Sequence, residues 1–446
     1  MRNIFLIVVL LMASSSAISQ HILPLRDQAR IIDEITGERL EQVLPNLMKR
    51  ENIQMWVLIC REYNEDPVIK TMLPASWLSA RRRTILVFYY NPTTGEYKKY
   101  AVARYNVGKH ILSAWNPEEE PNQWKALTKI IEKHQPNHIA INYSTHYGHA
   151  DGLSLTDYKE LLEHLPKPLQ SKLVSGEKLS VGWLESRTEK ELQYYTQLVH
   201  ITHQIIREGF SEQVIMPGIT TTDDMVWWFR EKIRGLGLET WFQPSVAVQR
   251  RDNSNQEQER SFANRPKEEV IQRGDLIHVD IGIQYLRLNT DIQQHAYLLL
   301  PGEKEPPTEL QNAFRVSNRL QDILTQQFAV GVTGNQILRN ALEQAKKEGI
   351  TASIYSHPLG MHGHAAGPTI GLWDQQGGVP GSGDYPVYPN TAYSIELNTN
   401  SFLPSWKKQV RIMLEEDGFF DGKTFHYLGG RQKKLWTIPA LSNELE

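Results

Sequence analysis

Residues 274 to 291 constrain the fold most, because they place a carboxylate in the middle of an apolar strand. Alternation predicts a strand with Ile277 and Val279 on one face and Asp280 on the other. An acid there is costly to bury unless positive charge neutralises it. Asp291 follows eleven residues later, which suits a turn and a return strand. Two adjacent carboxylates repel each other unless cations lie between them. A turn-capping role for Asp291 stays open at this point.

A second feature is a cluster of histidines among glycines. His357, His362 and His364 fall within eight residues of a chain that has fifteen histidines in all. Glycine allows the backbone to approach a ligand closely, and neutral imidazole is the commonest metal ligand. The cluster therefore predicts a ligand site.

Two further strand-like runs carry an acid where an apolar residue is expected. Glu396 lies in residues 391 to 398, and Glu415 lies in residues 410 to 417. Alone, Glu396 would fit a solvent-facing strand position. Together with the aspartates and histidines, these acids form a set that suits Mn²⁺, Zn²⁺ or Co²⁺. Two such ions can share a water and polarise a carbonyl, so hydrolysis there would need no protein nucleophile.

The ordered pattern from Asp280 to Glu415 resembles the pita-bread metallopeptidases, a family that includes aminopeptidase P, prolidase, methionine aminopeptidase and creatinase. The resemblance spans residues 185 to 440. It implies five metal ligands: Asp280, Asp291, His364, Glu396 and Glu415. It also implies catalytic proton-transfer or supporting roles for His357 and His362. Two alternatives remain, in which His362 replaces His364 or Glu416 replaces Glu415 as the ligand.

The chain departs from the usual family pattern around the second aspartate. Gln293 and Gln294 stand where the family usually has a Thr-Arg pair. The loop that begins at Pro244 lacks the histidine typical of proline-specific members, and Trp373 lies in a region where another histidine is expected. The metal set is complete while the substrate-orienting set is altered, which indicates a divergent subfamily.

The resemblance implies an exopeptidase with two divalent ions, Mn²⁺ foremost and Zn²⁺ or Co²⁺ as alternatives, and the N-terminal segment described below predicts that it is exported. Its substrates would be proline-containing peptides, cleaved after an N-terminal residue that precedes proline by attack of a metal-bridging hydroxide. The alternatives are a prolidase-type dipeptidase, a creatinase-like C–N hydrolase without metal, and a non-catalytic pita-bread protein that binds peptides or partners. The family also suggests a homodimer or larger assembly.

The length of 446 residues predicts two domains, which follow an N-terminal targeting segment. Residues 1 to 19 read as a signal peptide, which predicts a periplasmic or secreted protein. Residues 20 to 184 alternate strand and helix patterns and resemble the N-terminal α/β domain of creatinase and prolidase. A net charge of −3 argues against nucleic acid as a partner. No further segment is apolar enough to predict a stable membrane span, and Cys60 is the only cysteine, expected as a buried apolar residue.

Residues 185 to 440 are expected to form an α/β (α+β) pita-bread domain with an internal pseudo-twofold duplication. Residues 217 to 220 and 331 to 333 both read as helix starts. Gly218 and Gly331 lie 331 − 218 = 113 residues apart. Each predicted helix follows a longer one, at residues 189 to 208 and about 308 to 326. Two similar halves facing each other would form a cleft between them.

Overall fold

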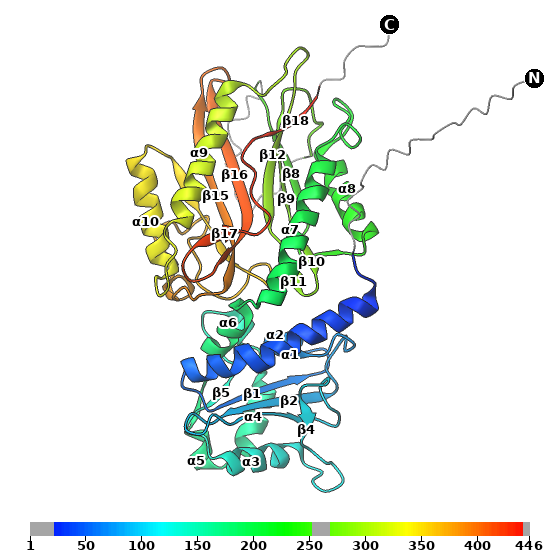
Figure 1. Ribbon diagram of the computed structural model, residues 1–446, viewed down its shortest axis with the longest axis vertical. Helices are drawn as coiled ribbons and strands as arrows, with labels where there is room; N and C mark the ends of the chain where they lie inside the picture. Colours follow the sequence, from blue (N-terminus) through cyan, green and yellow to red (C-terminus); the bar gives the residue numbers. More distant parts are fainter. Residues whose placement is uncertain (1–21, 252–267, 440–446) are drawn as a thin grey trace, which may run out of the picture.

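The computed structural model describes residues 22–251 and 268–439. The expected signal peptide, residues 1 to 19, lies outside the described residues. The chain forms two parts, an N-terminal part that is blue to cyan and a larger C-terminal part that is green to red (Figure 1). Within the described ranges, no helix has the length and apolar character needed to cross a bilayer.

The N-terminal part is an α/β sandwich around a sheet whose described strands run in the order β4-β3-β2-β1-β5-β6. These strands are β1 (Met55–Arg61), β2 (Arg83–Tyr90), β3 (Tyr97–Val102), β4 (Leu112–Ser113), β5 (Ile139–Ile141) and β6 (Leu173–Ser175). Their alternating side chains pack into two apolar clusters, one on each face of the sheet. Cys60 on β1 is buried and free, as the sequence predicted.

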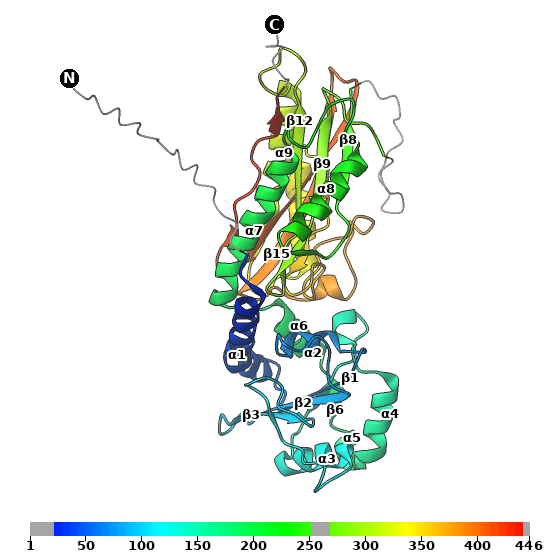
Figure 2. The same cartoon turned by 90° about the vertical axis from the view of Figure 1, so that its right-hand side faces the viewer.

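Helices cover both faces of this sheet (Figure 2). They are α1 (Leu25–Arg50), α2 (Pro67–Met72), α3 (Gln123–His134), α4 (Leu155–His164), α5 (Lys167–Gln170) and α6 (Glu177–Glu185), with a 3-10 turn at Gly148–Ala150. Leu40 of α1 and Trp183 of α6 belong to one cluster, and Leu127 and Ile131 of α3 belong to the other. The sheet is therefore a middle layer between two helical layers.

The C-terminal part is built on a sheet with the main strand order β13-β15-β16-β12-β9-β8 among the described residues. Its strands are β8 (Ser245–Gln249), β9 (Leu276–Ile281), β12 (Ile292–Leu298), β13 (Ala352–Ile354), β14 (His357–Leu359), β15 (Thr391–Leu403), β16 (Lys408–Phe420), β17 (Phe425–Tyr427) and β18 (Trp436–Ile438). A smaller described sheet joins β7 (Glu239–Thr240), β10 (Ile283–Tyr285) and β11 (Leu288–Asn289). A 3-10 turn spans Ser382–Asp384.

Two helix pairs pack on this sheet (Figure 1). The first is α7 (Glu189–Gly209) with α8 (Thr222–Gly235), and the second is α9 (Thr308–Thr325) with α10 (Gly334–Lys347). Helix α8 packs on β8, and α9 packs on β15 and β16. Thr221 and Thr333 cap α8 and α10 through reciprocal side-chain and backbone hydrogen bonds. Helix α8 therefore begins after residues 217 to 220, which form the turn ahead of it.

The two parts are joined where α6 ends and α7 begins. Glu185 is buried at this junction, and its Oε1 accepts a hydrogen bond of 3.4 Å from the Tyr385 hydroxyl. Its Oε2 has no hydrogen-bond partner. Burial, partly offset by the charge of Arg50, raises the pKa of Glu185 to about 8. The folded protein therefore holds this carboxyl in its neutral form near neutral pH.

Glu185 should make the stability of the fold fall as pH rises. Its folded pKa of about 8 lies above the usual 4.5, so its stabilising contribution is complete below pH 4.5 and lost as pH rises to 8. The slope for one group is at most about 1.4 kcal/mol per pH unit. Denaturant unfolding between pH 5 and 8 should show a shallower loss for Glu185→Gln than for the wild type. The exposed Glu118→Gln variant is the control, and equal slopes for Glu185→Gln and the wild type would show that Glu185 is ionised.

Candidate metal centre

Strand register brings three of the predicted acids into one line across the C-terminal sheet. Asp280 on β9 pairs with Gln293 on β12, and Gln293 pairs with Glu415 on β16. Glu415 in turn pairs with Glu396 on β15. Directly paired residues of antiparallel strands project from the same face. The polar side chains of these four positions therefore form one row.

Asp291 joins this row from the residue just before β12. It is 3% exposed, and its backbone N–H donates to the Asp417 carboxylate at 3.2 Å. Ligand oxygens of Asp280, Asp291 and Glu415 lie within 4.8 Å of one another. The turn-capping alternative thus gives way to a buried carboxylate in a cluster of three.

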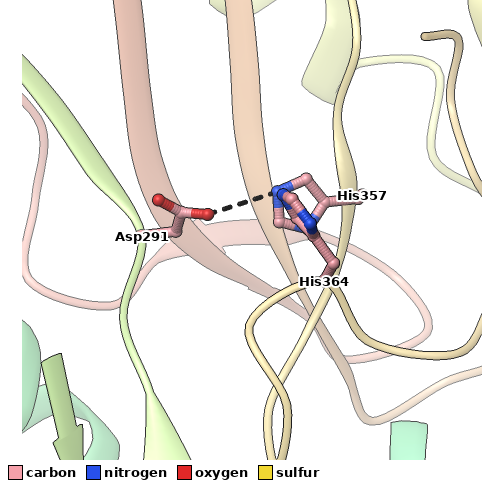
Figure 3. A group of neighbouring side chains, drawn as sticks. All are labelled: Asp291, His357 and His364. Carbon is pink, nitrogen blue, oxygen red and sulfur yellow. Dashed lines mark ion pairs between the residues drawn. The ribbon is translucent and has the colours of Figure 1, made fainter. Parts of the chain in front are cut away.

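His357, which the sequence analysis placed in a supporting role, projects into the cluster. It lies on β14, where it pairs with Ser394 of β15. Its Nε2 is 3.4 Å from Asp291 Oδ2, the distance of an ion pair (Figure 3). The same nitrogen is 3.6 Å from Glu415 Oε1. Ligand atoms of His357, Glu396 and Glu415 also lie within 4.8 Å of one another. A second group of possible ligands therefore adjoins the first and shares Glu415 with it.

His364, the histidine expected among the ligands, is exposed on the loop after β14. One of its ring nitrogens lies within 4.8 Å of ligand atoms of Asp291 and His357 (Figure 3). Its ring packs edge-on against His357 and Trp241, with centroids 4.8 Å and 5.1 Å away. Partial desolvation of the ring and the charge of His357 lower the pKa of His364 to about 4. His364 is therefore a neutral imidazole at the rim of the cluster.

His362, the other catalytic histidine expected, points toward the N-terminal part. Its ring centroid is 4.5 Å from that of His149, in the 3-10 turn Gly148–Ala150. Burial and the charge of His149 lower the pKa of His362 to about 3. His362 belongs to none of the ligand groups found among the described residues.

Glu415 and Glu416 lie on opposite faces of β16. Glu416 is 1% exposed, and its carboxylate contacts His203 Nε2 at 2.6 Å and Gln294 Nε2 at 2.8 Å. It takes no part in the groups that contain Glu415. The one-residue shift considered from the sequence would replace a residue of the cluster with one from a separate network.

The electrostatics of the cluster call for added positive charge. Burial and the charge of Glu415 raise the pKa of Asp291 and of Glu396 well above their usual ranges. For His357, burial alone would lower the pKa, but Glu415 raises it above its ordinary value. One imidazole among four carboxylates leaves excess negative charge in a buried site. The side chains present therefore fit divalent cations, which take carboxylate oxygens and imidazole together.

The sequence analysis missed several residues that shape the centre. Ser394 Oγ donates to Glu415 Oε1 at 2.6 Å, and Gln293 donates to both glutamates of the row. Trp241 Nε1 donates to the Thr290 carbonyl at 2.8 Å. Alternation along β15 could have placed Ser394 on the same face as Glu396. Nothing in the sequence near Trp241 signals its contact with His364, because that contact depends on tertiary packing.

Comparisons with known proteins agree with this arrangement. The sequence model described as metallopeptidase family M24 matches residues 193–417. No curated protein matches the sequence. The X-Pro aminopeptidase from Thermotoga maritima has a similar structure, with 16% identity, a TM-score of 0.60, and coverage of 87% of this chain and 99% of that one.

Other solved structures share the fold at lower identity. The Xaa-Pro dipeptidase from Bacillus anthracis is 14% identical, with a TM-score of 0.58, covering 93% of this chain and 100% of that one. The N-terminal domain of the FACT complex subunit SPT16 from Cicer arietinum is 10% identical, with a TM-score of 0.52, covering 93% of this chain and 99% of that one. These likenesses confirm the predicted α/β fold class, a pita-bread domain behind an N-terminal domain.

Proposed function

Because the chain belongs to metallopeptidase family M24, we propose that it is a metal-dependent exopeptidase that removes the N-terminal residue from peptides with proline in second position. The observation that carries the proposal is the buried cluster of Asp280, Asp291, His357, Glu396 and Glu415. When bound, two divalent ions would polarise the scissile carbonyl and lower the pKa of a water molecule. Mn²⁺ is the first candidate, with Zn²⁺ and Co²⁺ as alternatives.

The chain's own residues would take two roles at this site: five would hold the ions and one would contact the substrate. Asp280, Asp291 and Glu415 would hold one ion, and His357, Glu396 and Glu415 the other. This assignment differs from the sequence-based expectation, because His357 is grouped with Glu396 and Glu415 as well as with Asp291, whereas His364 is grouped only with Asp291 and His357. His364, exposed and neutral at the rim, would donate a hydrogen bond from a ring nitrogen to the substrate. Its place on a glycine-containing loop leaves that nitrogen accessible to a peptide.

The surroundings of His364 support a proline-containing substrate. Trp241 lies against His364, and Phe242 packs edge-on against Trp241 with a centroid distance of 4.5 Å. Such an aromatic wall offers apolar surface to the proline ring. Two of the similar structures carry X-Pro or Xaa-Pro in their names. The loop after Pro244 lacks the family histidine, so the residue preferred before proline should differ from that of typical members.

Metal-loaded protein should cleave X-Pro peptides faster than matched X-Ala peptides. The protein is stripped with a chelator, reloaded separately with Mn²⁺, Zn²⁺ or Co²⁺, and assayed on X-Pro dipeptides, X-Pro-Y tripeptides and longer peptides by mass spectrometry. Cleavage restricted to dipeptides would favour the prolidase-type alternative, and equal rates on X-Ala peptides would overturn the proline preference. Absence of cleavage with every ion would overturn the peptidase proposal.

The second candidate is a non-catalytic protein that binds peptides or partners. It is favoured by the likeness to the SPT16 domain, which is described as part of a complex subunit. Tight peptide binding by the metal-loaded protein without cleavage would support it. Creatinase-like C–N hydrolysis would instead persist in the chelated protein.

A further inference from the structure

Two neighbouring glutamines on β12 make the same kind of contact on opposite faces of the sheet. Gln293 Nε2 lies 2.6 Å from Glu396 Oε1 and 2.6 Å from Glu415 Oε2. Gln294 Nε2 lies 2.8 Å from Glu416 Oε1, outside the metal cluster. Both glutamines are buried, at 4% and 1% exposed. Only Gln293 therefore contacts proposed metal ligands.

The Gln293 amide can take only one orientation in this setting. Carboxylates that hold divalent ions are ionised and only accept hydrogen bonds, so in the metal-loaded site the NH₂ end must face the two glutamates. The amide oxygen then faces His278 Nε2 at 2.9 Å. His278 is 3% exposed and pairs with His295 in the register of β9 and β12. With its N–H at Nε2, His278 fixes the amide oxygen and so aims both amide hydrogens at the glutamates.

We propose that Gln293, anchored by His278, is a positioning residue that holds the carboxylates of Glu396 and Glu415 ready for divalent ions, an inference that rests on the proposed function. Without the amide, two buried carboxylates would repel each other and turn apart. The Gln293 amide donates one hydrogen bond to each glutamate and contacts only one carboxylate oxygen of each. The other Glu415 oxygen, Oε1, is the one that faces His357 at 3.6 Å.

At this position the chain differs from the usual family pattern. The family usually has a threonine two residues after the second aspartate, and a threonine side chain is too short to reach both glutamates from β12. Groups that orient metal ligands contribute about 10- to 100-fold to metal affinity in other proteins. The Gln293 amide is a longer donor that contacts two proposed ligands at once.

The test compares Gln293→Met with Gln294→Met in the full chain. Each change keeps the side-chain length and removes a buried amide that contacts one or more glutamates. Calorimetric titration of the metal-free proteins with Mn²⁺ and with Zn²⁺ should give an affinity about 10- to 100-fold weaker for Gln293→Met. Gln294→Met should stay within about threefold of the wild type. Equal affinities for Gln293→Met and the wild type, or an equal loss in Gln294→Met, would overturn the inference.

A second variant covers the case in which Gln293→Met does not fold. His278→Leu leaves Gln293 in place and frees its amide to turn, so affinity should fall in the same direction but by a smaller factor. Unchanged affinity in His278→Leu would contradict the anchoring role. Wild-type protein that binds no divalent ion would defeat the proposed function itself. Wild-type protein that binds ions and cleaves peptides, with unaffected Gln293 and His278 variants, would defeat only this inference.

Discussion

Replacing His357 with alanine should remove bound metal and reduce turnover by at least about 10³-fold, whereas replacing His364 should leave the metal in place. The loss for His357 corresponds to about 4 kcal/mol of transition-state stabilisation, the scale expected when a catalytic ion is lost. His364→Ala should cost about 10²-fold in kcat, the low end of the effect of removing a proton donor. Although the two histidines are only seven residues apart, His357→Ala should lose metal and His364→Ala should lose only turnover.

The geometry explains the difference. The Nδ1 of His357 lies 2.9 Å from the Pro358 carbonyl, so an N–H at Nδ1 donates there and leaves Nε2 as the ligand atom. Pairing of β14 with β15 fixes the backbone of His357 opposite Ser394. His364 has no strand to hold it and is exposed on its loop. A ligand needs a fixed nitrogen, whereas a group that meets the substrate needs access.

Elemental analysis of the purified variants and kcat on an X-Pro tripeptide provide the two measurements. His426→Ala is a control, because His426 is exposed like His364 and forms an ion pair with an aspartate like His357. Its metal content and kcat should equal those of the wild type. Loss of metal from His364→Ala with retention in His357→Ala would return the ligand role to His364, as the sequence motif suggested.

The sequence predicted the strands of the site better than their pairing. Alternation alone placed Asp280 and Glu396 on strands, because each interrupts an apolar run with period two. It could not show that Asp280, Gln293, Glu415 and Glu396 form one row, because the pairing of Gln293 with Glu415 joins segments 122 residues apart. Gln293 was noted only as a departure from the family pattern.

The proposed preference for His357 over His364 as a ligand could not follow from sequence for a related reason. Glycines around His364 favoured it as the residue that could approach an ion closely. The short strand β14, three residues long, carries His357 and gives almost no periodic signal. Its position depends on pairing with β15 more than 30 residues later. Local pattern thus identified the cluster of histidines, and the proposed choice of His357 rests on tertiary pairing.

A second large effect, on the free energy of unfolding, is expected at the junction of the two parts, where one glutamate forms ion pairs with two buried arginines. Glu191 on α7 contacts Arg39 of α1 at 2.7 Å and Arg187 at 3.0 Å. The side chains are 0% exposed for both arginines and 1% for the glutamate. Burial lowers the pKa of Arg39 to about 10, although Glu191 opposes the shift. Glu191 therefore holds together α1 and the start of α7.

Glu191→Gln should destabilise the protein by about 3–5 kcal/mol, because it leaves two buried guanidinium groups without a counter-charge. Denaturant unfolding measures the loss. The matched control is Glu348→Gln, which breaks an exposed pair with Arg319 and should leave the midpoint unchanged. Adding Arg39→Met to Glu191→Gln removes one of the orphaned charges, so the double variant should be more stable than the sum of the single losses predicts. Strict additivity, or a Glu191→Gln midpoint equal to that of the control, would show that water reaches this junction and that the ion pairs do not hold the two parts together.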